Sequence, residues 1–97
     1  MSELTDLLDQ VCDRDSFFAF VQALIEDRRD EVEKERVRPS SPWGPGANGW
    51  ENGTIEAYLE AALVWAGSTG MGESQGLPAG PTWRAFAVFL YCGKIYE

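Results

Sequence analysis

Histidine is absent from the sequence, and this absence excludes several kinds of active site. Imidazole is the usual general base near neutral pH, so hydrolysis through Ser-His-Asp or Cys-His groups is excluded. A structural zinc ion needs four ligands, mostly from cysteine and histidine, and the chain has only Cys12 and Cys92. The glycine-rich stretch from Gly67 to Ser74 has glutamate where a phosphate-binding loop needs lysine. We therefore expect no cofactor and no catalytic residue of these classes.

Basic residues are scarce as well. The chain has eight lysines and arginines against sixteen acids, which gives a net charge of −8 and an isoelectric point near 4.4. Proteins that bind nucleic acids cluster lysine and arginine to neutralise phosphates, so we expect no nucleic-acid partner and no binding to anionic membranes. A basic protein partner or a bound cation is permitted. Residues 1–36 hold eleven of the acids and five of the bases.

Long apolar runs are missing too. The longest uncharged apolar run, Ala85 to Cys92, is far shorter than the roughly 20 residues that cross a bilayer. The first residues lack the basic and apolar regions of a secretory signal. We therefore expect a cytoplasmic protein outside the membrane, in which Cys12 and Cys92 are free thiols.

Glycine and proline are distributed unevenly. All five prolines and nine of the ten glycines lie between Arg38 and Gly53 or between Gly67 and Pro81. Segments free of both residues are typical of helices. Since 97 residues fit one domain, the sequence predicts an all-α fold, a small compact bundle of three to four helices with two Gly/Pro-rich loops. The predicted single domain spans 1–97, with helices at about 3–11, 15–36, 54–66 and 82–92 and loops at 37–53 and 67–81.

Capping residues and apolar periodicity support these helices. Thr54 and Thr82 are typical N-caps, and Gly67 and Gly93 are predicted to end the two helices that follow them. The segment 82–92 is apolar nearly all round, so periodicity alone does not separate a buried helix from a buried strand. Its cap, its terminal glycine and its length favour a helix. We expect Trp65 and Trp83 to be core residues.

The tail from Glu26 to Arg36 is almost wholly charged. Pairs of opposite charge at i, i+4 stabilise an exposed helix, so we predict a solvated helical extension here. A metal site is the alternative interpretation of these acids. Asp27 and Asp30 could face Glu56 and Glu60 on the next helix and hold Mg²⁺, as acidic pairs do in helical NTP pyrophosphatases. This arrangement would make the protein a carboxylate-based phosphohydrolase.

Two of the four tryptophans, Trp43 and Trp50, lie in the first Gly/Pro-rich loop. The loop could fold back so that both rings pack on the helices. Alternatively, the rings line a groove for a partner, because tryptophan and tyrosine dominate binding hot spots. Trp43 and Trp50, with the adjacent Glu51 and Asn52, are therefore the candidate partner-binding residues.

Three segments carry a resemblance to a known family. Trp50-Glu51-Asn52, followed by 54–62 and Trp65, resembles the W-E-N … T-L-E-x-F-L-E-A … W signature of an uncharacterised bacterial family of short acidic helical proteins. The end of the chain, 83–97, resembles that family's W-K-x-F-A … A-K-I-Y-E, and 15–24 resembles its opening helix. The resemblance implies a compact helical bacterial domain of unknown function and implies no catalytic residues.

Charge and composition together favour a non-enzymatic protein. We expect a protein-interaction or immunity-type module whose acidic helical face and loop tryptophans bind a basic protein, such as a toxin that it neutralises. The magnesium-dependent phosphohydrolase is the alternative. A homodimer is compatible with either function, because so apolar a last helix can leave surface to bury.

Overall fold

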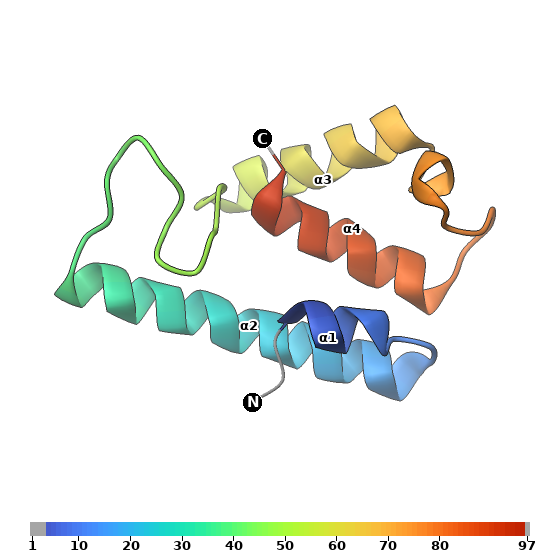
Figure 1. Cartoon of the computed structure of the whole chain (residues 1–97), viewed down its shortest axis with the longest axis horizontal. Coiled ribbons are helices and arrows are strands. Elements are labelled where there is room, and N and C mark those ends of the chain that lie inside the picture. Colours follow the sequence, from blue (N-terminus) through green and yellow to red (C-terminus); the bar gives the residue numbers. More distant parts are fainter. Residues whose placement is uncertain (1–3, 97) are drawn as a thin grey trace.

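The computed structural model describes residues 4–96, which contain four α-helices, one short 3-10 helix and no strand (Figure 1). The predicted small all-α bundle is confirmed. Glu3, at the start of the first predicted helix, and Glu97, in the closing motif, lie outside the described residues. Within that range, none of the helices has the length and apolar character needed to cross a membrane. The elements are α1 (Leu4–Asp9), α2 (Arg14–Val37), α3 (Ile55–Thr69), η1 (Glu73–Gln75) and α4 (Trp83–Ile95).

Helix α4 lies between the two longest helices and packs on both (Figure 1). α1 packs on α2 and α4 at the N-terminal end of α2. The backbones of α2 and α3, by contrast, do not approach closely: no Cα atom of one lies within 8 Å of a Cα atom of the other. α4 therefore packs between two helices whose backbones stay apart.

The long helices begin at side-chain caps. Thr54 and Thr82 accept hydrogen bonds from backbone N–H groups three residues later, as predicted. α2 begins slightly earlier than predicted because Asp13, rather than a later residue of the same cluster, is its N-cap. The Asp13 carboxylate accepts from the backbone N–H of Ser16, whose hydroxyl in turn accepts from the N–H of Asp13, which completes a capping box.

Two helix ends differ from prediction, because Gly67 and Gly93 do not stop their helices. α3 continues through Gly67 and ends at Gly70, whose φ of 59° is the left-handed conformation that favours glycine. α4 continues through Gly93 to Ile95. A Cβ atom on Gly93 would lie 2.6 Å from the ring of Tyr58 on α3, so this glycine allows α3 and α4 to approach closely.

The core contains two fully buried aromatic side chains, Trp65 and Phe20. The prediction for Trp65 is confirmed, but Trp83 is not a core residue: it is 38% exposed and its ring lies 5.4 Å from that of Phe17 at the edge of the bundle. Its position in the first residue of α4, directly after the loop, explains this exposure. Both cysteines are free, as expected. Burial raises the pKa of the Cys92 thiol to about 11, which makes it unreactive.

Candidate functional site

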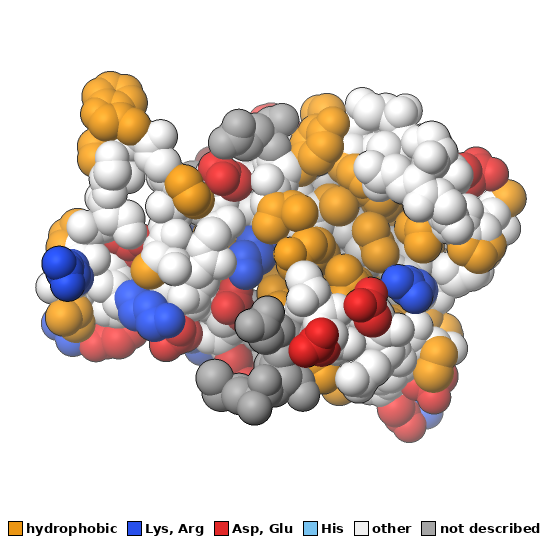
Figure 2. Space-filling view, viewed as in Figure 1, with side chains coloured by type: hydrophobic (Ala, Val, Ile, Leu, Met, Phe, Trp, Pro, Cys, Tyr) orange, Lys and Arg blue, Asp and Glu red, His pale blue; other side chains and the backbone are white. Residues whose placement is uncertain are grey.

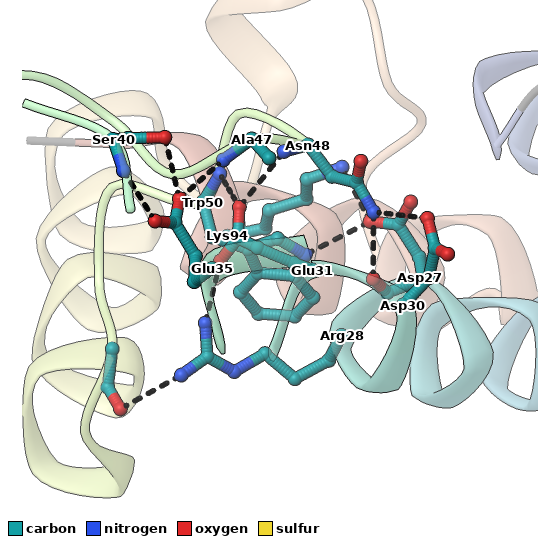
Figure 3. Close-up of polar contacts among 11 residues, drawn as sticks. Asp27, Arg28, Asp30, Glu31, Glu35, Ser40, Ala47, Asn48, Trp50 and Lys94 are labelled. Atoms are coloured by element: carbon teal, nitrogen blue, oxygen red, sulfur yellow. Dashed lines mark hydrogen bonds and ion pairs between the residues drawn. The ribbon is translucent and has the colours of Figure 1, made fainter. Parts of the chain in front are cut away.

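The charged C-terminal half of α2 was predicted to be a solvated extension. Instead, it holds the loop formed by 38–54. Four acids of α2 accept hydrogen bonds from that loop or form an ion pair with α4 (Figure 3). The carboxylates point from α2 toward the backbone and side chains of the loop (Figure 3). We call this set the carboxylate clamp, and it consists of Asp27, Asp30, Glu31 and Glu35.

Glu31 is the buried centre of the clamp, and it is only 2% exposed. Its Oε1 accepts hydrogen bonds from the backbone N–H groups of Asn48 and Trp50, at 3.0 and 3.1 Å. Its Oε2 accepts from Arg28 Nη1 at 2.6 Å. A Cβ atom on Gly46 would lie 2.3 Å from this carboxylate, so any side chain there would have to displace the carboxylate from its position. A buried carboxylate is tolerated when it is paired and hydrogen-bonded in this way.

Glu35, which is half-buried, and Asp30, which is exposed, hold the loop at two further points. Glu35 accepts from the Ser40 hydroxyl and backbone N–H and from the backbone N–H of Ala47. The bonds from Ser40 hold the pKa of the Glu35 carboxyl below its ordinary value. Asp30 pairs with Lys34 at 2.8 Å and accepts from the Asn48 side chain, and these contacts lower the pKa of the Asp30 carboxyl.

Trp50 is packed rather than free. Its side chain is 8% exposed, and its indole N–H donates to Asp27 at 2.8 Å. The same Asp27 oxygen pairs with Lys94 of α4 at 2.7 Å. The ring lies between two cations, with Arg28 5.4 Å and Lys94 5.6 Å from its centroid, and 5.9 Å from the ring of Tyr58. Trp50 therefore joins the loop to α2, α3 and α4.

Asn52 and Glu51 join the loop to the end of α4. The Asn52 side-chain amide donates to the carbonyl oxygens of Gly93 and Tyr96, at 2.9 and 2.8 Å. The backbone N–H of Glu51 donates to the carbonyl of Lys94. The last carbonyls of a helix have no partner within the helix, so these donors satisfy them. This contact gives the Trp50-Glu51-Asn52 motif and the closing segment a shared structural role.

Trp43 differs from the other candidate partner-binding residues. It is 94% exposed, and it lies in the outer part of the loop, where hydrophobic side chains stand away from the body of the molecule (Figure 2). The structure thus separates the four predicted residues: Trp43 faces solvent, while Trp50, Glu51 and Asn52 contact α2 or α4.

The four acids of the alternative magnesium site are not brought together. Asp27 is engaged with Lys94 and Trp50, and Asp30 with Lys34 and Asn48. Glu56 and Glu60 are exposed on α3. In the described part of the chain, no group of three or more cysteine or acidic side chains is arranged to hold a metal ion.

An open groove of about 420 Å³ lies between α2 and α3. Its floor includes the buried Leu24 and Trp50 and the half-buried Tyr58, whose hydroxyl donates to the carbonyl of Leu90 at 2.7 Å. Burial raises the pKa of Tyr58 to about 12, so this phenol stays neutral at physiological pH. The complete lining is Leu24, Ile25, Arg28, Trp50, Asn52, Gly53, Thr54, Ile55, Tyr58 and Leu59.

Several residues of this site escape sequence reasoning, chiefly Glu31, Asn48 and Lys94. Arg28 and Glu31 have the i, i+3 spacing of an ordinary surface ion pair, and only the fold shows that the carboxylate is buried. The one usable signal is local: Gly46, Asn48 and Gly49 are turn residues directly before Trp50, which suggests a tight backbone approach there.

Comparison with known proteins places the chain in a family. Residues 13–97 match the model of a family of unknown function, DUF7660. The chain therefore belongs to this family, in agreement with the resemblance to an uncharacterised domain family. Neither curated proteins nor solved structures give a significant match.

Proposed function

We propose that this chain is a non-enzymatic protein-interaction module that binds a basic protein partner through Trp43 and the surface around the α2–α3 groove. The observation that carries the proposal is the exposure of Trp43, whose side chain is 94% accessible to solvent. Tryptophan is enriched among the residues that dominate binding energy at interfaces, because it buries a large apolar area in a pocket of the partner.

The carboxylate clamp supports this role because it holds the loop that carries Trp43. Glu31 and Glu35 accept hydrogen bonds from the loop's backbone on the C-terminal side of Trp43, and Glu35 also accepts from Ser40 on its N-terminal side. A loop fixed on both sides of its exposed ring loses less conformational entropy when a partner binds. The clamp thus favours recognition by a preorganised surface.

Net charge supports the choice of a basic partner. At −8 the chain attracts cationic proteins over distances of about a Debye length, which is roughly 8 Å at physiological ionic strength. Such steering raises the association rate and makes it sensitive to salt. A toxin neutralised by an immunity-type protein is one partner of this description.

The test is a comparison of affinity captures with the wild-type chain and Trp43→Ala in lysate of the native host. We expect a basic protein at one copy per chain, retained at physiological salt, enriched at low salt and lost with Trp43→Ala. Val37→Ala is the matched control, because Val37 is 69% exposed but lies at the end of α2. The proposal is overturned if no stoichiometric partner appears at either salt concentration, or if Trp43→Ala retains it.

A further inference from the structure

The groove between α2 and α3 is lined by side chains of both helices and by the loop residues Trp50, Asn52, Gly53 and Thr54. Both helices pack on α4, and no Cα atom of one lies within 8 Å of a Cα atom of the other. Three apolar side chains at its edges are largely in water: Ile25 is 41% exposed, Leu59 50% and Ile55 77%. In a helical bundle, such side chains are normally covered by a further helix.

The apolar surface continues along both helices beyond the groove itself. On α2, Phe18 and Val32 lie seven residues before and after Ile25, which places them on the same face, and they are 57% and 53% exposed. On α3, Leu63 follows Leu59 by four residues and is 67% exposed. Apolar edges on the two sides of a groove match the apolar face of one amphipathic helix.

The charges beside the two edges are not alike. Glu56 and Glu60 follow Ile55 and Leu59 on α3 by one residue each, so they lie on the solvent side of that edge. Neither has a hydrogen bond or ion pair with any other residue in the range 4–96. On α2, Arg29 adjoins the other edge, and Arg28 in the groove lining is neutralised by Glu31. On the same edge of α2, Glu26 and Glu33 follow Ile25 and Val32, but Glu33 pairs with Arg36 and Glu26 accepts from Gln22. The α3 edge therefore carries only acidic charge, whereas the α2 edge carries both signs.

From this geometry we infer that the α2–α3 groove binds an amphipathic helix of the partner, with apolar side chains in the groove and lysine or arginine opposite Glu56 and Glu60. The inference rests on the proposed function and specifies the partner's chemistry. Because α3 has 15 residues, a helix that lies along it needs about 15 residues, or roughly 22 Å. A second copy of the chain fits less well, since its charge of −8 would face the same acidic edge.

The test uses a synthetic helix of about 15 residues, with leucine at i, i+3, i+4 and i+7 and lysine elsewhere. Binding to the full chain is measured by isothermal titration calorimetry. Two peptides are the ligand controls: one with the same composition in scrambled order, and one with the same leucines but glutamate in place of lysine. We expect both controls to bind at least about tenfold more weakly, because one lacks the apolar face and the other the charge match.

Variants on α3 locate the binding surface. We expect Leu59→Ser and Glu60→Lys each to lower the association constant for the leucine-lysine helix by about tenfold. Val37→Ser is the matched control: Val37 is 69% exposed, lies at the end of α2 and does not line the groove, so binding should stay within about twofold of wild type. Thermal melts check that every variant is folded, and all three positions are exposed enough to permit substitution.

Each outcome decides between occupants of the groove. Equal losses for Leu59→Ser and Val37→Ser, or equal binding of the control peptides, overturn the inference. A wild-type dimer in sedimentation that Leu59→Ser dissociates also overturns it and assigns the groove to a second copy. If the helix fails to bind while a native partner is still lost with Trp43→Ala, only the groove inference fails. If the helix binds as expected but no partner depends on Trp43, only the proposed role of Trp43 fails.

Discussion

Glu31 on α2 and Glu60 on α3 are the same kind of side chain in opposite surroundings. Glu31 is 2% exposed and accepts hydrogen bonds from two backbone N–H groups and from Arg28. Glu60 is exposed and has no polar partner within residues 4–96. The comparison extends to their neighbours, since the clamp acids hold a loop while the α3 acids border an apolar groove. The role of an acid in this chain therefore depends less on how many acids there are than on whether each one already has a hydrogen-bond or ion-pair partner within the fold.

Replacing the buried clamp acid should have the largest effect. Glu31→Ala removes the ion-pair partner of Arg28, which keeps its bond to the Gly53 carbonyl, and leaves two backbone N–H groups without an acceptor, which costs about 3 kcal/mol. We expect the free energy of unfolding in urea to fall by that amount. Glu31→Gln keeps an oxygen for the two N–H groups and should lose less. A loss for Glu31→Ala no larger than for Glu60→Ala would remove the distinction between the two regions.

The close approach of loop and clamp can be tested without changing any charge. A Cβ atom on Gly46 would lie 2.3 Å from the Glu31 carboxylate, so Gly46→Ala should lower the free energy of unfolding by about 1–3 kcal/mol through overpacking. Gly44→Ala, in the same loop, is the control because a Cβ there meets no atom within 4 Å. Urea denaturation of both variants measures the difference, and equal stabilities would mean that the loop does not rest on Glu31.

Acid should weaken the clamp. In the folded chain the pKa of Glu35 is lowered by Ser40, and that of Asp30 by Lys34 and Asn48. A carboxyl whose pKa is lowered in the folded chain stabilises the fold at a pH above its ordinary pKa, which is 4.5 for Glu35 and 3.8 for Asp30. This stabilisation is lost as the pH falls through the lowered pKa. We expect the urea midpoint to drop below about pH 4.5, with a smaller drop in Ser40→Ala, which removes the main cause of the Glu35 shift. An identical pH profile for the two chains would contradict this account.

Local rules were sufficient to predict much of the fold. The caps at Thr54 and Thr82, and the gaps that glycine and proline leave, act within a few residues of each other, so the all-α bundle follows from the sequence. Gly67 and Gly93 were predicted wrongly as helix ends: α3 ends instead at Gly70, in the left-handed conformation, and Gly93 lies at a close contact between helices. Only the position of Tyr58 on the other helix decides for Gly93.

The candidate site could be predicted only in part, because its contacts join distant segments. Trp50 pairs with Asp27 and Asn52 with Gly93, over 23 and 41 residues of chain, and no spacing rule covers such distances. The composition of the loop indicated that Trp43 and Trp50 were special, but not that one is packed and the other exposed. That difference depends on which backbone N–H groups reach Glu31, and therefore on the folded path of the loop.

The smallest effect on stability is expected on α3. It is the most direct test of the difference between the clamp acids of α2 and the acids of α3. The double substitution Glu56→Gln and Glu60→Gln removes two charges that form no hydrogen bond or ion pair with any described residue. Glu56 lies in the first turn of α3, where a negative charge favours the helix N-terminus, so the free energy of unfolding should change by no more than about 0.5 kcal/mol. The same variant should bind the leucine-lysine helix more weakly than wild type, as calorimetry would show. If neutralising these two charges leaves the stability unchanged but weakens binding, the charges act in binding a partner and not in stabilising the fold. A loss of stability comparable to that of Glu31→Ala would instead make these acids part of the fold.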